Sequence, residues 1–265
     1  MPILLIYDCH LYYEAQGQGE TILFIHGLGS STRDWDAQVG AFASAYRVIT
    51  FDLRGHGRSD KPAGPYSIDL FASDAVGLLE ALEVEAAHIV GISLGGAVAF
   101  QLALDHPALV KTLTIVNSAP TMGISEEDAR REIERRVGIV QKMGMRAMGE
   151  ALAPNLFPNP EQAALRHTFV ERWAENDPQA YIDATRSMLG WTVLDKISSI
   201  QCPSLILASD QDYTPVAVKE AYVKLMPHAE LVVLPEAHHA VPVEAPAKFN
   251  AALEAFLKQH ESHGH

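Results

Sequence analysis

The chain reads Ile89-Val90-Gly91-Ile92-Ser93-Leu94-Gly95-Gly96, an apolar run that ends in the pattern Gly-x-Ser-x-Gly. The run predicts a buried strand, and the residues from Leu94 to about His106 predict a helix. A sharp turn between the two would expose the serine hydroxyl, and glycines at the flanking positions leave room for that turn. The helix N-terminus then faces any negative charge that develops beside the serine. We therefore predict that Ser93 is a nucleophile.

The same alternation of strand and helix extends outward from this turn. Most of the apolar runs are unbroken, which is typical of strands covered on both faces of a parallel sheet. The predicted strands are Ile3–Tyr7, Leu11–Glu14, Ile22–Ile25, Arg47–Phe51, His88–Ile92, Thr112–Val116, Ser204–Leu207 and Leu231–Leu234, and the predicted helices cover about 67–82, 95–106, 215–226 and 245–259. The pattern indicates an α/β protein with a doubly wound, mostly parallel sheet. The first two strands are close enough in sequence to form an antiparallel hairpin at one edge.

The alternation stops between residues 119 and 189, where helix signals replace it. Ser125 begins a capping box, and Asn159 and Asp177 each precede a proline at a first helical position. We expect residues 119–189 to form an all-helical cap or lid, inserted into a core made of residues 1–118 and 190–265. Segments inserted over a site commonly shape its pocket.

Composition and charge narrow the class of partner. The 265 residues carry 20 Lys+Arg and 33 Asp+Glu, a formal net charge of −13. Such an acidic chain is a poor ligand for nucleic acid, whose phosphates require clustered cations. The apolar window from Ala86 to Leu104 is accounted for by the strand and helix around Ser93, so we expect no membrane span. No secretory signal is visible, because Ile3–Ile6 is too short and no basic segment precedes it, and we expect a cytoplasmic location.

Two further stretches carry a resemblance to a known family. His26-Gly27-Leu28-Gly29 follows one predicted strand, and Asp52-Leu53-Arg54-Gly55-His56-Gly57-Arg58-Ser59-Asp60 follows the next. Together with Gly-x-Ser-x-Gly they resemble the α/β-hydrolase fold family over nearly the whole chain. The resemblance implies a Ser-acid-His triad and an oxyanion hole formed by the backbone N–H groups of Leu28 and Leu94. We assign His26, Arg54 and His56 to loop structure.

The acid of the implied triad should follow a late strand. The segment after Leu205–Leu207 offers Asp210 and Asp212. The family pattern places the acid three residues after a glycine, and Ser209 occupies that glycine position. The spacing favours Asp212, and Asp210 remains the alternative.

The base presents a similar choice between His238 and His239. Family members usually carry Glu and Pro five and seven residues after the base, and a glycine just before it. Glu244 and Pro246 therefore point to His239, with His238 in the glycine position. We predict His239 as the general base.

These residues imply a serine esterase that cleaves carboxylic esters of small to medium acyl chains through an acyl-enzyme. Ser93 excludes the epoxide hydrolases and haloalkane dehalogenases of this fold, which carry aspartate there. Enol-lactone hydrolases remain the main alternative. Carbon–carbon bond hydrolases usually carry asparagine where this chain has Ile92, and a non-catalytic small-ligand receptor has no need of an activated serine. We expect a small-molecule ester or lactone substrate and neither a cofactor nor a metal, and the sequence leaves open whether the chain forms a homo-oligomer.

Overall fold

A mixed sheet forms the centre of the computed structural model, which describes residues 2–122 and 125–260. Within those residues it has eight strands, in the order β1-β2-β4-β3-β5-β6-β7-β8. The strands are β1 (Ile3–Ile6), β2 (Cys9–Gln16), β3 (Thr21–Ile25), β4 (Arg47–Phe51), β5 (Ala87–Ile92), β6 (Val110–Val116), β7 (Ser204–Ser209) and β8 (Ala229–Leu234). β1 and β2 form an antiparallel hairpin, β2 pairs antiparallel with β4, and all later pairings are parallel. The predicted α/β class and edge hairpin are confirmed.

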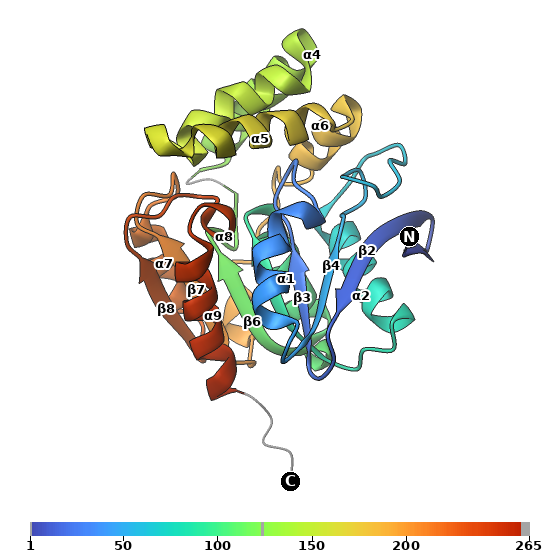
Figure 1. The fold of residues 1–265 in the computed structure, drawn as a ribbon, viewed down its shortest axis with the longest axis vertical. Helices are drawn as coiled ribbons and strands as arrows, with labels where there is room; N and C mark the ends of the chain where they lie inside the picture. The colour runs from blue at the N-terminus through green and yellow to red at the C-terminus, as the bar shows by residue number, and fades with distance from the viewer. Residues whose placement is uncertain (1, 123–124, 261–265) are drawn as a thin grey trace.

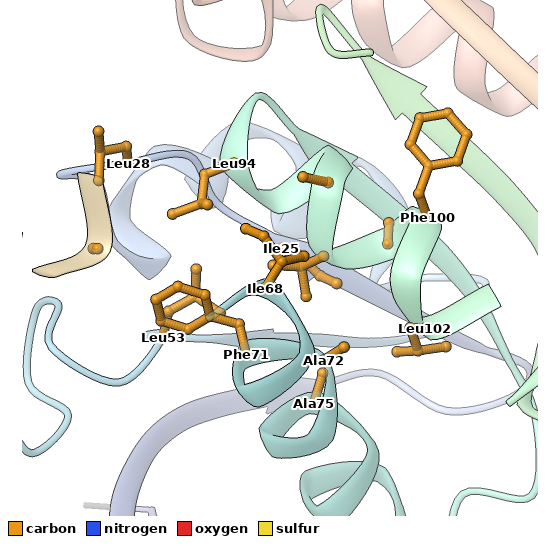
Figure 2. Close-up of a cluster of buried hydrophobic side chains, with 14 of the residues drawn as sticks. Ile25, Leu28, Leu53, Ile68, Phe71, Ala72, Ala75, Leu94, Phe100 and Leu102 are labelled. Carbon is orange, nitrogen blue, oxygen red and sulfur yellow. The ribbon is translucent and has the colours of Figure 1, made fainter. Parts of the chain in front are cut away.

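Helices cover both faces of this sheet. They are α1 (Asp36–Phe42), α2 (Ile68–Ala81), α3 (Leu94–Asp105), α4 (Glu126–Leu156), α5 (Ala163–Ala174), α6 (Pro178–Arg186), α7 (Val216–Val223), α8 (Val241–Glu244) and α9 (Pro246–Gln259), with short 3-10 turns at Thr32–Trp35, Pro107–Leu109, Pro160–Gln162 and Ile197–Ser199. Apolar side chains of α1 and α9, such as Phe42 and Phe249, pack on one face. Those of α2 and α3, such as Phe71 and Phe100, pack on the other face. Figure 2 shows part of this second cluster. The strands β3 and β7 between these layers are entirely buried.

The helices α4, α5 and α6 lie between β6 and β7 in the sequence and form a layer of their own (Figure 1). Their starts follow from capping: Ser125 Oγ accepts from the Asp128 N–H at 3.1 Å, and Asp177 Oδ1 accepts from the Ala180 N–H at 2.8 Å. α4 is interrupted at Gly144, where φ is +82°. Such a backbone conformation suits glycine, so the two halves of α4 take different directions there.

Two features of the fold were not predicted. Helix α1 has only seven residues and includes Gly40, so its periodic signal is too short to separate from a loop. Helix α8 is a single turn just after His239. Among residues 2–122 and 125–260, no helix is both long and apolar enough to span a membrane.

Candidate active site

Ser93 is the single residue between β5 and α3. Its φ of +55° and ψ of −118° lie far from ordinary strand or helix values, as a sharp turn requires. A Cβ on Gly91 would lie 2.1 Å from the carbonyl oxygen of Gly95, and a Cβ on Gly95 would lie 2.2 Å from that of Ile25. Only glycine fits at either position. The backbone of Ser93 is held by its N–H bond to Val116 O at 3.1 Å and by Ser118 Oγ, which donates to Ser93 O at 2.7 Å.

The loop after β3 lies beside this turn because the two strands end within one residue of each other. Ile25 of β3 pairs with Gly91 of β5, so the residues that follow each strand are neighbours. Leu28 lines the same pocket as Ser93. Neither the Leu28 nor the Leu94 N–H has a hydrogen-bond acceptor among the described residues, so both amides are available to an oxygen held over Ser93. His26 braces the loop: its Nδ1–H donates to Gly27 O at 2.7 Å, and its Nε2 accepts from the Leu53 N–H at 3.0 Å.

Asp212 and His239 come together at the other half of the site. β7 and β8 end level, with Ser209 paired to Leu234, and the loops that follow carry the two side chains. His239 Nδ1 lies 2.8 Å from Asp212 Oδ1. Because a carboxylate only accepts hydrogen bonds, the proton belongs on Nδ1, and the lone pair of Nε2 is directed away from Asp212.

A buried lysine holds the other oxygen of Asp212. Lys219 Nζ, on α7, lies 2.6 Å from Asp212 Oδ2, and both side chains are 0% exposed. Burial acts to raise the pKa of Asp212, but its contacts with His239 and Lys219 outweigh burial and hold the pKa below its usual range. Burial lowers the pKa of Lys219. The aspartate is thus kept ionised behind the imidazole.

Tyr213 approaches the opposite edge of the imidazole. Its hydroxyl lies 2.6 Å from His239 Nε2, and its ring stacks on the imidazole with centroids 4.1 Å apart. Because Nδ1 carries the proton, the phenol donates to Nε2. The side chain of Tyr213 is 54% exposed as a whole, but its hydroxyl is surrounded by protein. Burial of the hydroxyl is the main cause that raises the pKa of Tyr213. Arg136 and a hydrogen bond with Ser93 act to lower this pKa, and burial outweighs them. The Tyr213 hydroxyl thus contacts both His239 Nε2 and Ser93, and the described residues show no direct hydrogen bond between Ser93 and His239.

The alternative acid and base have other partners. Asp210 Oδ1 accepts from the Ala237 N–H at 3.2 Å. His238 Nδ1 lies 3.0 Å from Glu244 Oε2, and the His238 N–H donates to the other oxygen of the same carboxylate. Both residues therefore stabilise the loop that carries His239 rather than facing Ser93.

Asn117, at the end of β6, fastens that loop to the sheet. Its Nδ2 group donates to the carbonyl oxygens of His238 and His239 at 3.2 and 3.0 Å and to Ser209 Oγ at 2.8 Å. Its Oδ1 accepts from the Ser209 N–H at 2.8 Å. The φ of Asn117 is +45°, a conformation that asparagine tolerates better than most residues. The loop that carries His239 is thus fixed to the end of β6.

A pocket joins these core residues to the inserted helices. Ser93, His239 and Tyr213 line one side of a cavity of about 80 Å³, and the other side is lined by Arg136, Leu152, Leu156, Phe169 and Trp173 from α4 and α5. A larger cavity of about 350 Å³ adjoins it, shares Phe169 and Trp173, and is bordered by ion pairs such as Arg172–Asp34. No group of three or more His, Cys, Asp or Glu side chains is placed to hold a metal ion in the described part of the chain.

The sequence did not point to Lys219, Tyr213, Asn117 or Arg136 as site residues. One feature of the sequence could have indicated that Lys219 is buried. It lies three residues before Tyr222, so the two side chains lie on the same, buried face of α7. Arg136 is 77 positions from Tyr213, and no local pattern places them together.

Comparison with known proteins defines the class. Residues 22–252 match the alpha/beta hydrolase family. The chain is 30% identical to 3-oxoadipate enol-lactonase 2 of Acinetobacter baylyi, over 95% of this chain and 94% of that protein. Among solved structures it is similar to the enol-lactonase from Burkholderia xenovorans LB400 (24% identity, TM-score 0.91, covering 97% of this chain and 100% of that one). It is also similar to Est816, described as an N-acyl homoserine lactone degrading enzyme (32% identity, TM-score 0.84, covering 96% and 100%).

The chain therefore belongs to the alpha/beta hydrolase family. It is a hydrolase, and its relatives act on small molecules such as lactones.

Proposed function

We propose that the protein hydrolyses carboxylic esters through an acyl-enzyme, with Ser93 as nucleophile, His239 as general base and Asp212 as the residue that orients the imidazole. One observation carries the proposal. Asp212 Oδ1 lies 2.8 Å from His239 Nδ1 and accepts its N–H, so that the basic lone pair of Nε2 faces the pocket into which the strained turn presents Ser93. A serine hydroxyl needs such a base to become a useful nucleophile.

The reaction runs in two halves. Nε2 takes the proton of Ser93 as Oγ attacks the ester carbonyl, and the resulting oxyanion accepts hydrogen bonds from the Leu28 and Leu94 amides. The imidazolium then gives its proton to the departing alkoxide, which leaves as the alcohol. Water, deprotonated by Nε2, attacks the acyl-enzyme in the same way and releases the acid and free Ser93. Both halves use Nε2 directly, so the Tyr213 hydroxyl must leave that nitrogen when substrate enters.

A cyclic ester can follow the same path, and enol-lactone hydrolysis is the second candidate. The relative with 30% identity carries that activity in its name. In a lactone the alcohol remains tethered to the acyl group, and it departs only when the acyl-enzyme is hydrolysed. The proposed machinery is the same for both substrates, and α4 to α6 act as the cap that selects between them.

The test compares neighbouring residues with p-nitrophenyl acetate, p-nitrophenyl butyrate and a panel of lactones. Ser93→Ala and His239→Gln should each lower turnover by about 10⁶. His238→Gln, one position away, is the matched control and should retain most activity. A fluorophosphonate probe should label wild type but not Ser93→Ala. Full activity of Ser93→Ala with a folded circular dichroism spectrum would overturn the assignment.

A further inference from the structure

Arg136 brings a buried positive charge to the pocket of Ser93. It projects from α4, its side chain is 13% exposed, and it lines the same cavity as Ser93, Tyr213 and His239. A guanidinium buried to this degree requires either a counter-charge or an anionic ligand, because burial of an unpaired ion is costly. The partners of Arg136 therefore show what the pocket is prepared to bind.

The protein compensates only part of this charge. Glu132 accepts from Arg136 Nε at 2.6 Å, but it also accepts from Arg135 Nε and Nη2, both at 2.8 Å. One carboxylate thus serves two guanidinium groups, and the cluster keeps a net charge of +1. Asp34 is the acidic residue among those that line the pocket. It is already paired with Arg172 at 3.0 Å and hydrogen-bonded to Ser30.

Two neutral phenols are further neighbours of Arg136. They are the hydroxyls of Tyr181 and of Tyr213, of which Tyr213 also lines the pocket, and Arg136 acts to lower the pKa of each. The Tyr181 side chain is buried, with 1% of it exposed. A buried guanidinium that shares its carboxylate partner with a second guanidinium and lines the pocket of Ser93 is a site for an oxyanion.

We propose that Arg136 binds a carboxylate carried by the substrate, so that the pocket selects anionic esters or lactones over neutral ones. The inference rests on the proposed ester hydrolysis and names its substrate class. In the free protein the Tyr213 hydroxyl lies among Ser93, His239 and Arg136. When an anionic substrate enters, it would displace the Tyr213 hydroxyl from this position. The ester to be cleaved would then lie at Ser93, and the carboxylate would lie at Arg136.

The experiment compares two pairs of ester substrates, and the members of each pair have nearly equal shape. Hydrolysis of each ester is measured in a pH-stat, which titrates the acid that is released. Monomethyl succinate and methyl pentanoate differ in charge on the acyl side, and butyryloxyacetate and propyl butyrate differ on the alcohol side. In at least one pair, wild type should favour the anionic ester in kcat/KM by about 10- to 100-fold, the range expected for a charge-assisted hydrogen bond. Arg136→Gln should remove that preference, so that the ratio of kcat/KM for the anionic ester to kcat/KM for the neutral ester falls to about one.

Arg135→Gln is the matched control, because it removes the other guanidinium on Glu132 from a side chain that does not line the pocket. It should retain the preference, and Arg136→Lys should retain part of it. Succinate should inhibit hydrolysis of methyl pentanoate in wild type and much less in Arg136→Gln. If the wild-type protein has equal kcat/KM for the anionic and the neutral ester in both pairs, the proposed role of Arg136 is overturned. The proposal of ester hydrolysis would still stand. Absence of all ester hydrolysis would instead count against the proposed function.

Discussion

The hydroxyl of Tyr213 lies 2.6 Å from Nε2 of His239, so the nitrogen that the proposed reaction needs is already engaged in the free protein. The stacking of the two rings at 4.1 Å holds the phenol in place. The side chain is nonetheless 54% exposed, so it has room to turn outward. We interpret Tyr213 as a positioning residue that sets the resting state of the imidazole.

Removing this hydroxyl should make Ser93 more reactive. Tyr213→Phe keeps the stacked ring but frees Nε2 to accept from Ser93 directly. A neutral hydrogen bond contributes about 0.5–1.5 kcal/mol, so the rate of fluorophosphonate labelling should rise by about two- to tenfold. The rate constant of labelling is obtained from labelling reactions that are stopped at several times. The kcat/KM for p-nitrophenyl butyrate gives a second measurement. A tenfold or larger decrease in both would mean that the phenol takes part in proton transfer.

Loss of Lys219 should affect both stability and the acid side of the pH profile. Lys219→Met leaves Asp212 buried with one partner fewer, and breaking a buried ion pair costs about 3–5 kcal/mol. The pKa of Asp212 is lowered in the folded protein, so the stability it contributes is present above the unfolded pKa and is lost as pH falls through the folded pKa. Without Lys219 that loss should begin at higher pH.

Urea unfolding and kcat/KM measured between pH 3.5 and 8 would follow both effects. Lys224→Met is the control, since that lysine is exposed just beyond the same helix. Unchanged unfolding free energy in Lys219→Met would show that the ion pair does not stabilise the fold.

The two histidines near Leu53 should make the fold sensitive to acid. Burial lowers the pKa of His26 to about 4, and burial together with the nearby His26 lowers that of His56 to about 3. Below the unfolded value of 6.5, the unfolded chain binds protons that the folded protein does not, so the free energy of unfolding falls as pH decreases. Above pH 6.5 neither state binds them and this dependence disappears.

His56→Phe tests that contribution. Nε2 of His56 is buried without a hydrogen-bond partner among the described residues, and the ring packs against Phe71, so phenylalanine suits the position. The slope of unfolding free energy between pH 6 and 4.5 should decrease by about 1.4 kcal/mol per pH unit, the value for one proton. Chemical denaturation at four pH values measures it. Parallel curves for wild type and variant would contradict the assignment.

The sequence was sufficient for the fold and for choosing candidate site residues because those depend on local patterns. Gly91 and Gly95 mark a turn that no larger residue can make, and unbroken apolar runs mark buried strands. The resemblance to the family pattern, read through its spacing, selected Asp212 and His239, whose Oδ1 and Nδ1 atoms the structure places 2.8 Å apart, whereas their catalytic roles stay a prediction. Arg136 and Tyr213 could not be predicted, because their proximity depends on how α4 packs over a loop that is distant in the sequence.

The position of α4, α5 and α6 between β6 and β7 has a consequence for engineering. One contiguous segment supplies the whole far wall of the Ser93 pocket, and it joins the sheet through only two connections. A gene cassette that encodes this segment from a homologue could be exchanged in a single cloning step. We expect such chimaeras to transfer substrate selectivity from one member of the family to another, while Ser93, Asp212 and His239 keep their positions on the sheet.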